Sequence, residues 1–239
     1  MRKKLYAKMT VVSSRIESTI DYPGKLSQVL FTSGCNFRCK FCHNPELIQI
    51  KNKGIDVDEI LKGLKSKAES GWCEGICISG GEPTINKDLP EIIKKIKKMN
   101  LAVKLDTNGT NPEMLKFLLE NKLVDYVAMD IKSRKEKYPE IVGEVEIEKI
   151  EESIELVKNF PDYEFRTTVL PFFIDEDLEE IGKWISKNGK VKRFTLQQFH
   201  REKTLAPEYG KLFPKSKEEI KELGEIMRKY AEEVVVHDY

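Results

Sequence analysis

The sequence contains no long apolar run and no large excess of charge of one sign. No apolar stretch approaches the roughly 20 residues that a helix needs to span a bilayer. The first residues, MRKKLYAKMTVVSS, lack the apolar core of a signal peptide, so we expect a cytoplasmic protein with no membrane partner. The 41 lysines and arginines almost balance the 40 aspartates and glutamates, which predicts no nucleic-acid partner.

The chain also lacks a low-complexity linker, an internal repeat of solenoid length and the even number of cysteines typical of a disulfide framework. Its 239 residues, 40% of them hydrophobic, are enough to bury one substantial core. We therefore predict a single domain over residues 1–239. Three of the five cysteines fall within eight residues, and this clustering fits a reducing compartment better than disulfide pairing.

Short runs rich in Val, Ile, Phe and Leu alternate with segments of helical periodicity. Such periodicity follows Asp56 and Asp88. Asn111 is a candidate N-cap followed by proline at the first helical position, and Asp175 is predicted to cap a later helix. The predicted strands are Leu26–Phe31, Gly75–Ser79, Leu101–Leu105, Val124–Met129, Tyr163–Leu170 and Arg193–Phe199.

About six such alternations with short connections predict an α/β fold with a parallel sheet, either barrel-like or open and doubly wound. Parallel sheets bind their ligands at the C-terminal ends of the strands. The residues best suited to chemistry fall at these ends. They are the clustered cysteines after the first strand, residues 79–83 after the second, residues 106–109 after the third, residues 130–132 after the fourth and His200 after the sixth.

The clustered cysteines are Cys35, Cys39 and Cys42, spaced C-x3-C-x2-C in a loop over residues 34–46. Structural zinc takes four closed ligands, and the two other cysteines lie more than thirty residues away. Three thiolates suit a [4Fe–4S] cluster whose fourth iron has no protein ligand. The alternative is a zinc site that His43 or Cys73 completes.

With Phe41 in its aromatic position, this cysteine spacing resembles the signature of the radical S-adenosylmethionine (SAM) superfamily. The similarity is greatest to glycyl-radical-enzyme activases, particularly those of anaerobic ribonucleoside-triphosphate reductase. It also rests on three segments, which are residues 18–24, residues 42–46 and residues 196–199. The resemblance implies a radical SAM core, a partial (β/α)6 TIM-like barrel of parallel strands.

The resemblance also implies roles for individual residues. Cys35, Cys39 and Cys42 would be the catalytic cluster ligands. Asp106, Thr107 and Asp130, with the backbone carbonyl of Ala128, are candidate ligands of a monovalent cation. The residues implied at the bound SAM are Phe41, Asn44, Gly80, Gly81, Glu82, Asp106, Thr107, Asp130, Lys132, Arg166 and His200. The alternatives are ordinary turn and capping chemistry for the Asp and Asn residues, a solvated strand end for Lys132 or Arg166, and a surface position for His200.

The activity implied by the resemblance is reductive cleavage of SAM to a 5′-deoxyadenosyl radical, which takes hydrogen from a glycine of a partner enzyme. Anaerobic ribonucleotide reductase is the expected partner, with a flavodoxin- or ferredoxin-type protein as electron donor. One alternative is a radical SAM enzyme that acts on a small molecule or a nucleobase. Another is a metal or electron-transfer module without catalytic activity, which would leave the Gly-Gly-Glu-Pro segment unexplained.

Overall fold

The computed structural model of the chain describes residues 9–49 and 54–237. These residues contain one eight-stranded sheet in which the strand order follows the chain order. The strands are β1 Val11–Ser18, β2 Ser27–Thr32, β3 Gly75–Gly80, β4 Ala102–Thr107, β5 Tyr126–Asp130, β6 Tyr163–Val169, β7 Val191–Gln198 and β8 Ala231–His237. The helices are α1 Val57–Glu69, α2 Leu89–Lys97, α3 Pro112–Glu120, α4 Tyr138–Val142, α5 Ile147–Val157, α6 Asp175–Ile185 and α7 Lys217–Met227.

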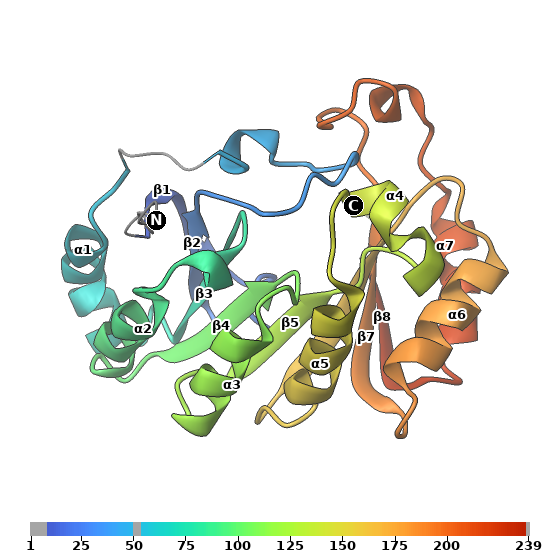
Figure 1. Cartoon of the computed structure of the whole chain (residues 1–239). Coiled ribbons are helices and arrows are strands. Elements are labelled where there is room, and N and C mark those ends of the chain that lie inside the picture. The colour runs from blue at the N-terminus through green and yellow to red at the C-terminus, as the bar shows by residue number, and fades with distance from the viewer. Residues whose placement is uncertain (1–8, 50–53, 238–239) are drawn as a thin grey trace, which may run out of the picture.

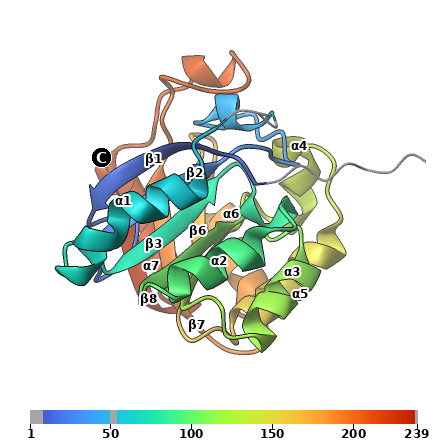
Figure 2. The ribbon, with the colours of Figure 1, turned by 90° about the vertical axis from the view of Figure 1, so that its left-hand side faces the viewer.

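The sheet is an open barrel. Strands β2 to β8 run parallel, whereas β1 pairs with β2 antiparallel. The edge strands β1 and β8 do not pair with each other in the described part of the chain. The crossover helices cover the outer face of the curved sheet, and Figure 2 shows α1 and α2 outside β3 (Figure 1). The predicted α/β class and partial barrel are confirmed.

Two strands extend the predicted set of six parallel strands. The edge strand β1 was missed because its sequence, VVSSRIES, is mostly polar, although Pro23-Gly24 marks a turn before β2. The strand β8 has only three consecutive valines between polar ends, which is a weak signal. Over the described residues the barrel therefore has seven parallel strands and one antiparallel edge strand, where six parallel strands were predicted.

One of the two predicted N-caps has the expected hydrogen bond, and the other differs. The side chain of Asn111 accepts from the Met114 N–H at 3.2 Å. At the start of α1, where helical periodicity after Asp56 was predicted, the Asp56 side chain accepts from the Asp58 N–H at 2.8 Å. The prediction for Asp175 was wrong, because this residue is already helical and the N-cap position is Ile174. The α6 start is instead held by Asp177, whose buried carboxylate accepts from the Ile174 N–H at 3.1 Å.

The two faces of the parallel strands differ in chemistry. Side chains alternate between faces along a strand, and on β4 the outward residues Val103 and Leu105 join the main hydrophobic core under the helices. The inward residues Lys104 and Asp106 face the barrel interior, where they are paired with charged groups of β6. The concave face is therefore polar, which is unusual for a parallel sheet with buried strands.

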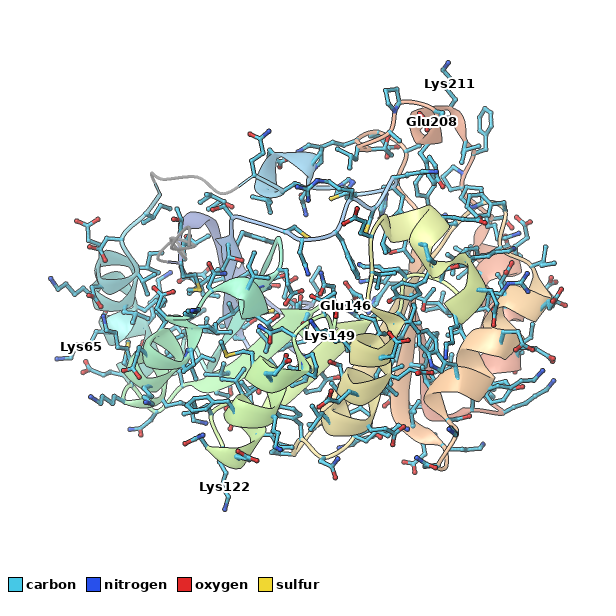
Figure 3. The ribbon with its side chains drawn as sticks, in the orientation of Figure 1. Lys65, Lys122, Glu146, Lys149, Glu208 and Lys211 are labelled. Carbon is cyan, nitrogen blue, oxygen red and sulfur yellow. The ribbon has the colours of Figure 1, made fainter. Side chains whose placement is uncertain are left out.

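Exposed charges cover the outer surface of the molecule, and Figure 3 labels one such pair, Glu146 and Lys149, at the start of α5. Their side chains, 2.8 Å apart, are 71% and 37% exposed, so this ion pair contributes little to stability. Within residues 9–49 and 54–237, every helix is too short or too polar to cross a membrane.

Candidate active site

A cavity of about 320 Å³ opens at the C-terminal ends of the parallel strands. The cluster loop and the segments that follow β3, β4, β5 and β7 surround it. All of the predicted site residues line this one cavity: Cys35, Cys39, Phe41, Cys42, Asn44, Gly80, Gly81, Glu82, Asp106, Thr107, Asp130, Lys132, Arg166 and His200. The fold thus brings together residues that are up to 165 positions apart in the sequence.

The cluster loop is held at its centre by two distant parts of the chain. The backbone N–H groups of Arg38 and Lys40 donate to carbonyl oxygens in α4, at 2.8 and 3.2 Å. The carbonyl of Lys40 in turn accepts from the Ala206 N–H at 2.9 Å. The loops that carry η1, Pro45–Leu47, and η4, Tyr209–Lys211, lie side by side above the sheet in Figures 1 and 2. These bonds position the three cysteines relative to the strand ends.

The three thiols face an environment that disfavours their ionisation in the absence of a bound cation. Burial raises the pKa of Cys35 to about 11 and that of Cys39 to about 12, and it raises the pKa of Cys42 as well. Cysteine sulfurs bind metals as thiolates, so these three thiols would lose their protons if they held a cluster. Three sulfur donors from one loop, beside a cavity that can hold a further ligand, fit a [4Fe–4S] cluster with one open iron.

The described residues contain no assembled set of four zinc ligands. Cys73 lies before the start of β3, at the opposite end of that strand from the cavity, and its thiol donates to the Gly75 carbonyl at 3.4 Å. The ring of His43 packs against that of His200, with centroids 5.5 Å apart. Across the described ranges, no three His, Cys, Asp or Glu side chains are arranged to hold a single metal ion.

The glycine pair at the end of β3 is required by close packing against the end of β2 and the start of the cluster loop. A Cβ on Gly80 would lie 2.3 Å from the Thr32 nitrogen, and one on Gly81 would lie 2.0 Å from the Gly34 carbonyl oxygen. The φ angle of Gly80 is also +119°, which other residues rarely adopt. Packing alone therefore requires glycine at both positions, whether or not their backbone also contacts a ligand.

The carboxylate of Glu82 joins the end of β3 to the end of β4. It is fully buried and accepts from Thr84 and Thr107 hydroxyls at 2.5 and 2.9 Å, and from the Asn108 N–H at 2.6 Å. Burial raises the pKa of Glu82, and these donors oppose that effect. The side chain of Glu82 is thus directed at the protein, so a ligand in the cavity would meet the backbone of this segment.

A row of alternating charges crosses the floor of the cavity. The Arg166 guanidinium lies between two carboxylates, 2.9 Å from Asp130 Oδ1 and 3.3 Å from Asp106 Oδ2. The Lys132 ammonium is 2.8 Å from the other oxygen of Asp130 and 5.8 Å from the centre of the Phe41 ring. Burial opposes ionisation of Asp130, but Arg166 and Lys132 outweigh it and hold the pKa of that carboxyl at about 2. Asp130 is therefore anionic throughout the physiological pH range.

The three side chains predicted to bind a monovalent cation do not converge on one point. The Thr107 hydroxyl donates to Glu82 and accepts from the Gly109 N–H, on the opposite face of β4 from Asp106. Asp106 and Asp130 are connected by Arg166. These side chains, as placed here, do not fit a cation, and Ala128 lies buried within β5.

Two contacts at this site could not be anticipated from the sequence. Asn108 ties β4 to the cluster loop, because its side chain donates to Asn36 at 3.0 Å and lies 4.0 Å from the Cys35 sulfur. Tyr138 supports the loop from α4, where its ring packs edge-on against Phe37. The Asn-Gly after β4 indicated only a turn, and α4 was not predicted, so neither contact could be anticipated.

The comparisons with known proteins agree with this arrangement. The sequence profile of the Radical SAM superfamily matches residues 29–185. The chain belongs to this superfamily. It is 40% identical over 227 residues to a Methanocaldococcus jannaschii protein assigned as a glycyl-radical enzyme activating enzyme, covering 92% of each chain. It is also 28% identical to the pyruvate formate-lyase-activating enzyme of Staphylococcus epidermidis, over 76% of this chain and 77% of that one. This radical SAM protein is thus an enzyme of the activase group.

Solved structures show the same fold. SuiB of Streptococcus suis, bound to its precursor peptide SuiA, superposes with a TM-score of 0.69 over 87% of this radical SAM chain, at 15% identity. The match covers 48% of SuiB, so the chain spans about half the length of that protein. The anSMEcpe protein with bound AdoMet superposes with a TM-score of 0.51 at 27% identity, over 69% of this chain and 48% of that one.

Proposed function

We propose that the chain activates a glycyl radical enzyme by generating a 5′-deoxyadenosyl radical from SAM at this cavity. The observation that carries the proposal is the placement of the three cysteines beside the strand-end residues of one cavity. The 40% identity over nearly the whole chain to a protein assigned as a glycyl-radical enzyme activating enzyme supports it. When bound, the [4Fe–4S] cluster supplies the electron that cleaves SAM.

Within this proposal, the residues of the chain hold and orient the reactants. Cys35, Cys39 and Cys42 would hold the cluster, and the backbone of Gly80 and Gly81 would contact the methionine part of SAM. The guanidinium of Arg166 and the ammonium of Lys132 are the cations that a carboxylate in the cavity would meet. Phe41, Asn44, Glu82, Asp106, Thr107, Asp130 and His200 would form the remainder of the SAM pocket.

We further propose anaerobic ribonucleotide reductase as the partner and a flavodoxin- or ferredoxin-type protein as the electron donor. The partner is suggested by the segment similarities at residues 18–24, 42–46 and 196–199, and the electron donor by the resemblance to the activases as a whole. The loop over residues 199–216 borders the cavity through His200 and offers a surface for the partner's glycine loop.

One continuous sheet through the described residues supports the proposal of a single domain over residues 1–239.

The test is anaerobic EPR spectroscopy of the reconstituted, reduced protein with SAM and the anaerobic ribonucleotide reductase of the same genome. A glycyl-radical doublet with an equivalent amount of 5′-deoxyadenosine is the expected result. 5′-Deoxyadenosine without the doublet would refute this partner while leaving SAM cleavage intact. A modified small molecule formed in the absence of any partner protein would favour the alternative substrate class.

A further inference from the structure

A buried lysine lies beneath the cavity. Lys104 stands two residues before Asp106 on β4, so both side chains are on the concave face. Lys104 is only 1% exposed, and its ammonium is 2.5 Å from Asp106 Oδ1. Around it lie the Cys77 sulfur at 3.9 Å and the Tyr126 ring at 5.7 Å from its centre. A lysine this deeply buried is rare and costly unless it is paired.

Lys104 is itself held by a second buried charge. Its ammonium is 3.9 Å from Glu164 Oε1, on β6, and the other oxygen of Glu164 accepts from the Thr195 hydroxyl at 2.6 Å. Glu164 is 5% exposed. Neither Lys104 nor Glu164 lines the cavity, so this pair lies in a layer below the predicted SAM site.

The charges of the two layers are balanced. The connected row contains the three carboxylates of Glu164, Asp106 and Asp130. It also contains the three cations of Lys104, Arg166 and Lys132. Each carboxylate lies within 4 Å of at least one of these cations. Three negative and three positive groups leave no net charge for an added cation to neutralise.

Both oxygens of Asp106 are already occupied. Oδ1 faces Lys104, and Oδ2 accepts from the Ser79 hydroxyl at 2.9 Å while it faces Arg166 at 3.3 Å. A carboxylate-bearing ligand in the cavity competes with Asp106 for Arg166, because the guanidinium lines the cavity. Lys104 approaches from outside the cavity, so Asp106 keeps a cationic partner whichever way Arg166 turns.

We propose that Lys104, oriented by Glu164, is a positioning residue that replaces an alkali cation beside Asp106 when SAM binds. This inference rests on the proposed function, because it concerns the same SAM site. In this arrangement the Lys104 ammonium supplies the positive charge that a bound monovalent cation would otherwise supply.

The first test uses the wild-type holoenzyme, reconstituted under anaerobic conditions and exchanged until potassium and sodium are substoichiometric by atomic emission. SAM affinity is measured by isothermal titration calorimetry in potassium chloride and in tetramethylammonium chloride at equal ionic strength. We expect dissociation constants that agree within about twofold. A loss of about tenfold or more in tetramethylammonium would overturn the inference. Absence of SAM binding in both salts would instead refute the proposed function.

The second test asks whether Lys104 is the group responsible. The Lys104→Met variant should bind SAM about tenfold more weakly in tetramethylammonium, because Asp106 loses a charged hydrogen-bond donor. Potassium should restore much of this loss, which a merely structural role for Lys104 would not produce. The control is Lys116→Met, at a side chain that is 61% exposed. Wild-type affinity of folded Lys104→Met in tetramethylammonium would overturn the inference.

Discussion

The two faces of the same strands perform different tasks. On the convex face, β4 presents Val103 and Leu105 to the helices, where burial of apolar surface stabilises the fold. On the concave face the same strand presents Lys104 and Asp106, whose desolvation is costly and must be compensated by opposite charges. A strand that alternates in this way can carry the stability of the barrel and the chemistry of its site on adjacent residues.

The largest expected effect follows removal of a predicted cluster ligand at the cavity. Cys39→Ala should lower SAM cleavage by more than about 100-fold, because loss even of a group that supports a metal ligand typically costs 10- to 100-fold. EPR spectroscopy and 5′-deoxyadenosine formation measure this. The matched control is Cys73→Ala, which removes a buried thiol that lies outside the cavity and should retain the cluster. Equal loss of the cluster in both variants would contradict the assignment.

On the convex face, Leu105→Ala should lower the free energy of unfolding by about 2–5 kcal/mol, because it leaves a cavity in the core. SAM affinity of the folded protein should stay unchanged. Its concave counterpart is Ser79→Ala, which removes the hydroxyl that donates to Asp106. That variant should lose only about 1 kcal/mol of stability but bind SAM more weakly. Urea unfolding and calorimetry distinguish the faces, and a reversed pattern would refute the comparison.

The concave charges should also appear in the acid stability of the apoprotein. The pKa of Asp130 is lowered from 3.8 to about 2, so its ionised form stabilises the fold above pH 4 and this contribution is lost as the pH falls to 2. The loss is on the order of 2 kcal/mol. Asp130→Asn should lack this part of the pH dependence when unfolding free energies are measured between pH 4 and 2. If the unfolding free energy of the variant and that of the wild type changed equally with pH, Asp130 would not be the responsible group.

The smallest effect is expected away from both faces, at the start of α3. Asn111→Ala removes the side-chain oxygen that accepts from the Met114 N–H and should cost about 1 kcal/mol of stability. Asp56→Ala at α1 provides the comparison, since Asp56 makes the same kind of capping bond. Thermal unfolding measures both. Asp56→Ala should leave SAM affinity unchanged, whereas Asn111→Ala also removes the amide that donates to the Thr84 carbonyl at 2.6 Å, next to Glu82. A loss of SAM binding in Asp56→Ala would mean that a remote helix start influences the cavity.

The sequence was sufficient for the parts of the fold that depend on local pattern. The six central strands are marked by runs rich in Val, Ile, Phe and Leu, the helix α1 by its periodicity after Asp56, and the capped start of α3 by Asn111. The edge strand β1 was not predictable, because its pairing with β2 depends on contacts that its polar sequence does not encode locally.

Of the site, the sequence predicted which residues gather at the cavity but not how they pair. Lys104 resembles any solvated lysine in the sequence, and only the curvature of the sheet buries it between Asp106 and Glu164. The position of Arg166 between two carboxylates likewise follows from the register of β4, β5 and β6. Pairing of this kind depends on three-dimensional packing that no short-range pattern records.

The attachment of the cluster loop has a consequence for biosynthesis. The loop precedes α4 and Ala206 in the sequence and so leaves the ribosome before them, yet its backbone is held by carbonyls of α4 and by the N–H of Ala206. A nascent chain that ends before residue 206 lacks the last of these bonds. The loop's backbone contacts are therefore complete only after residue 206 has been synthesised, so iron and sulfide would be delivered after that point.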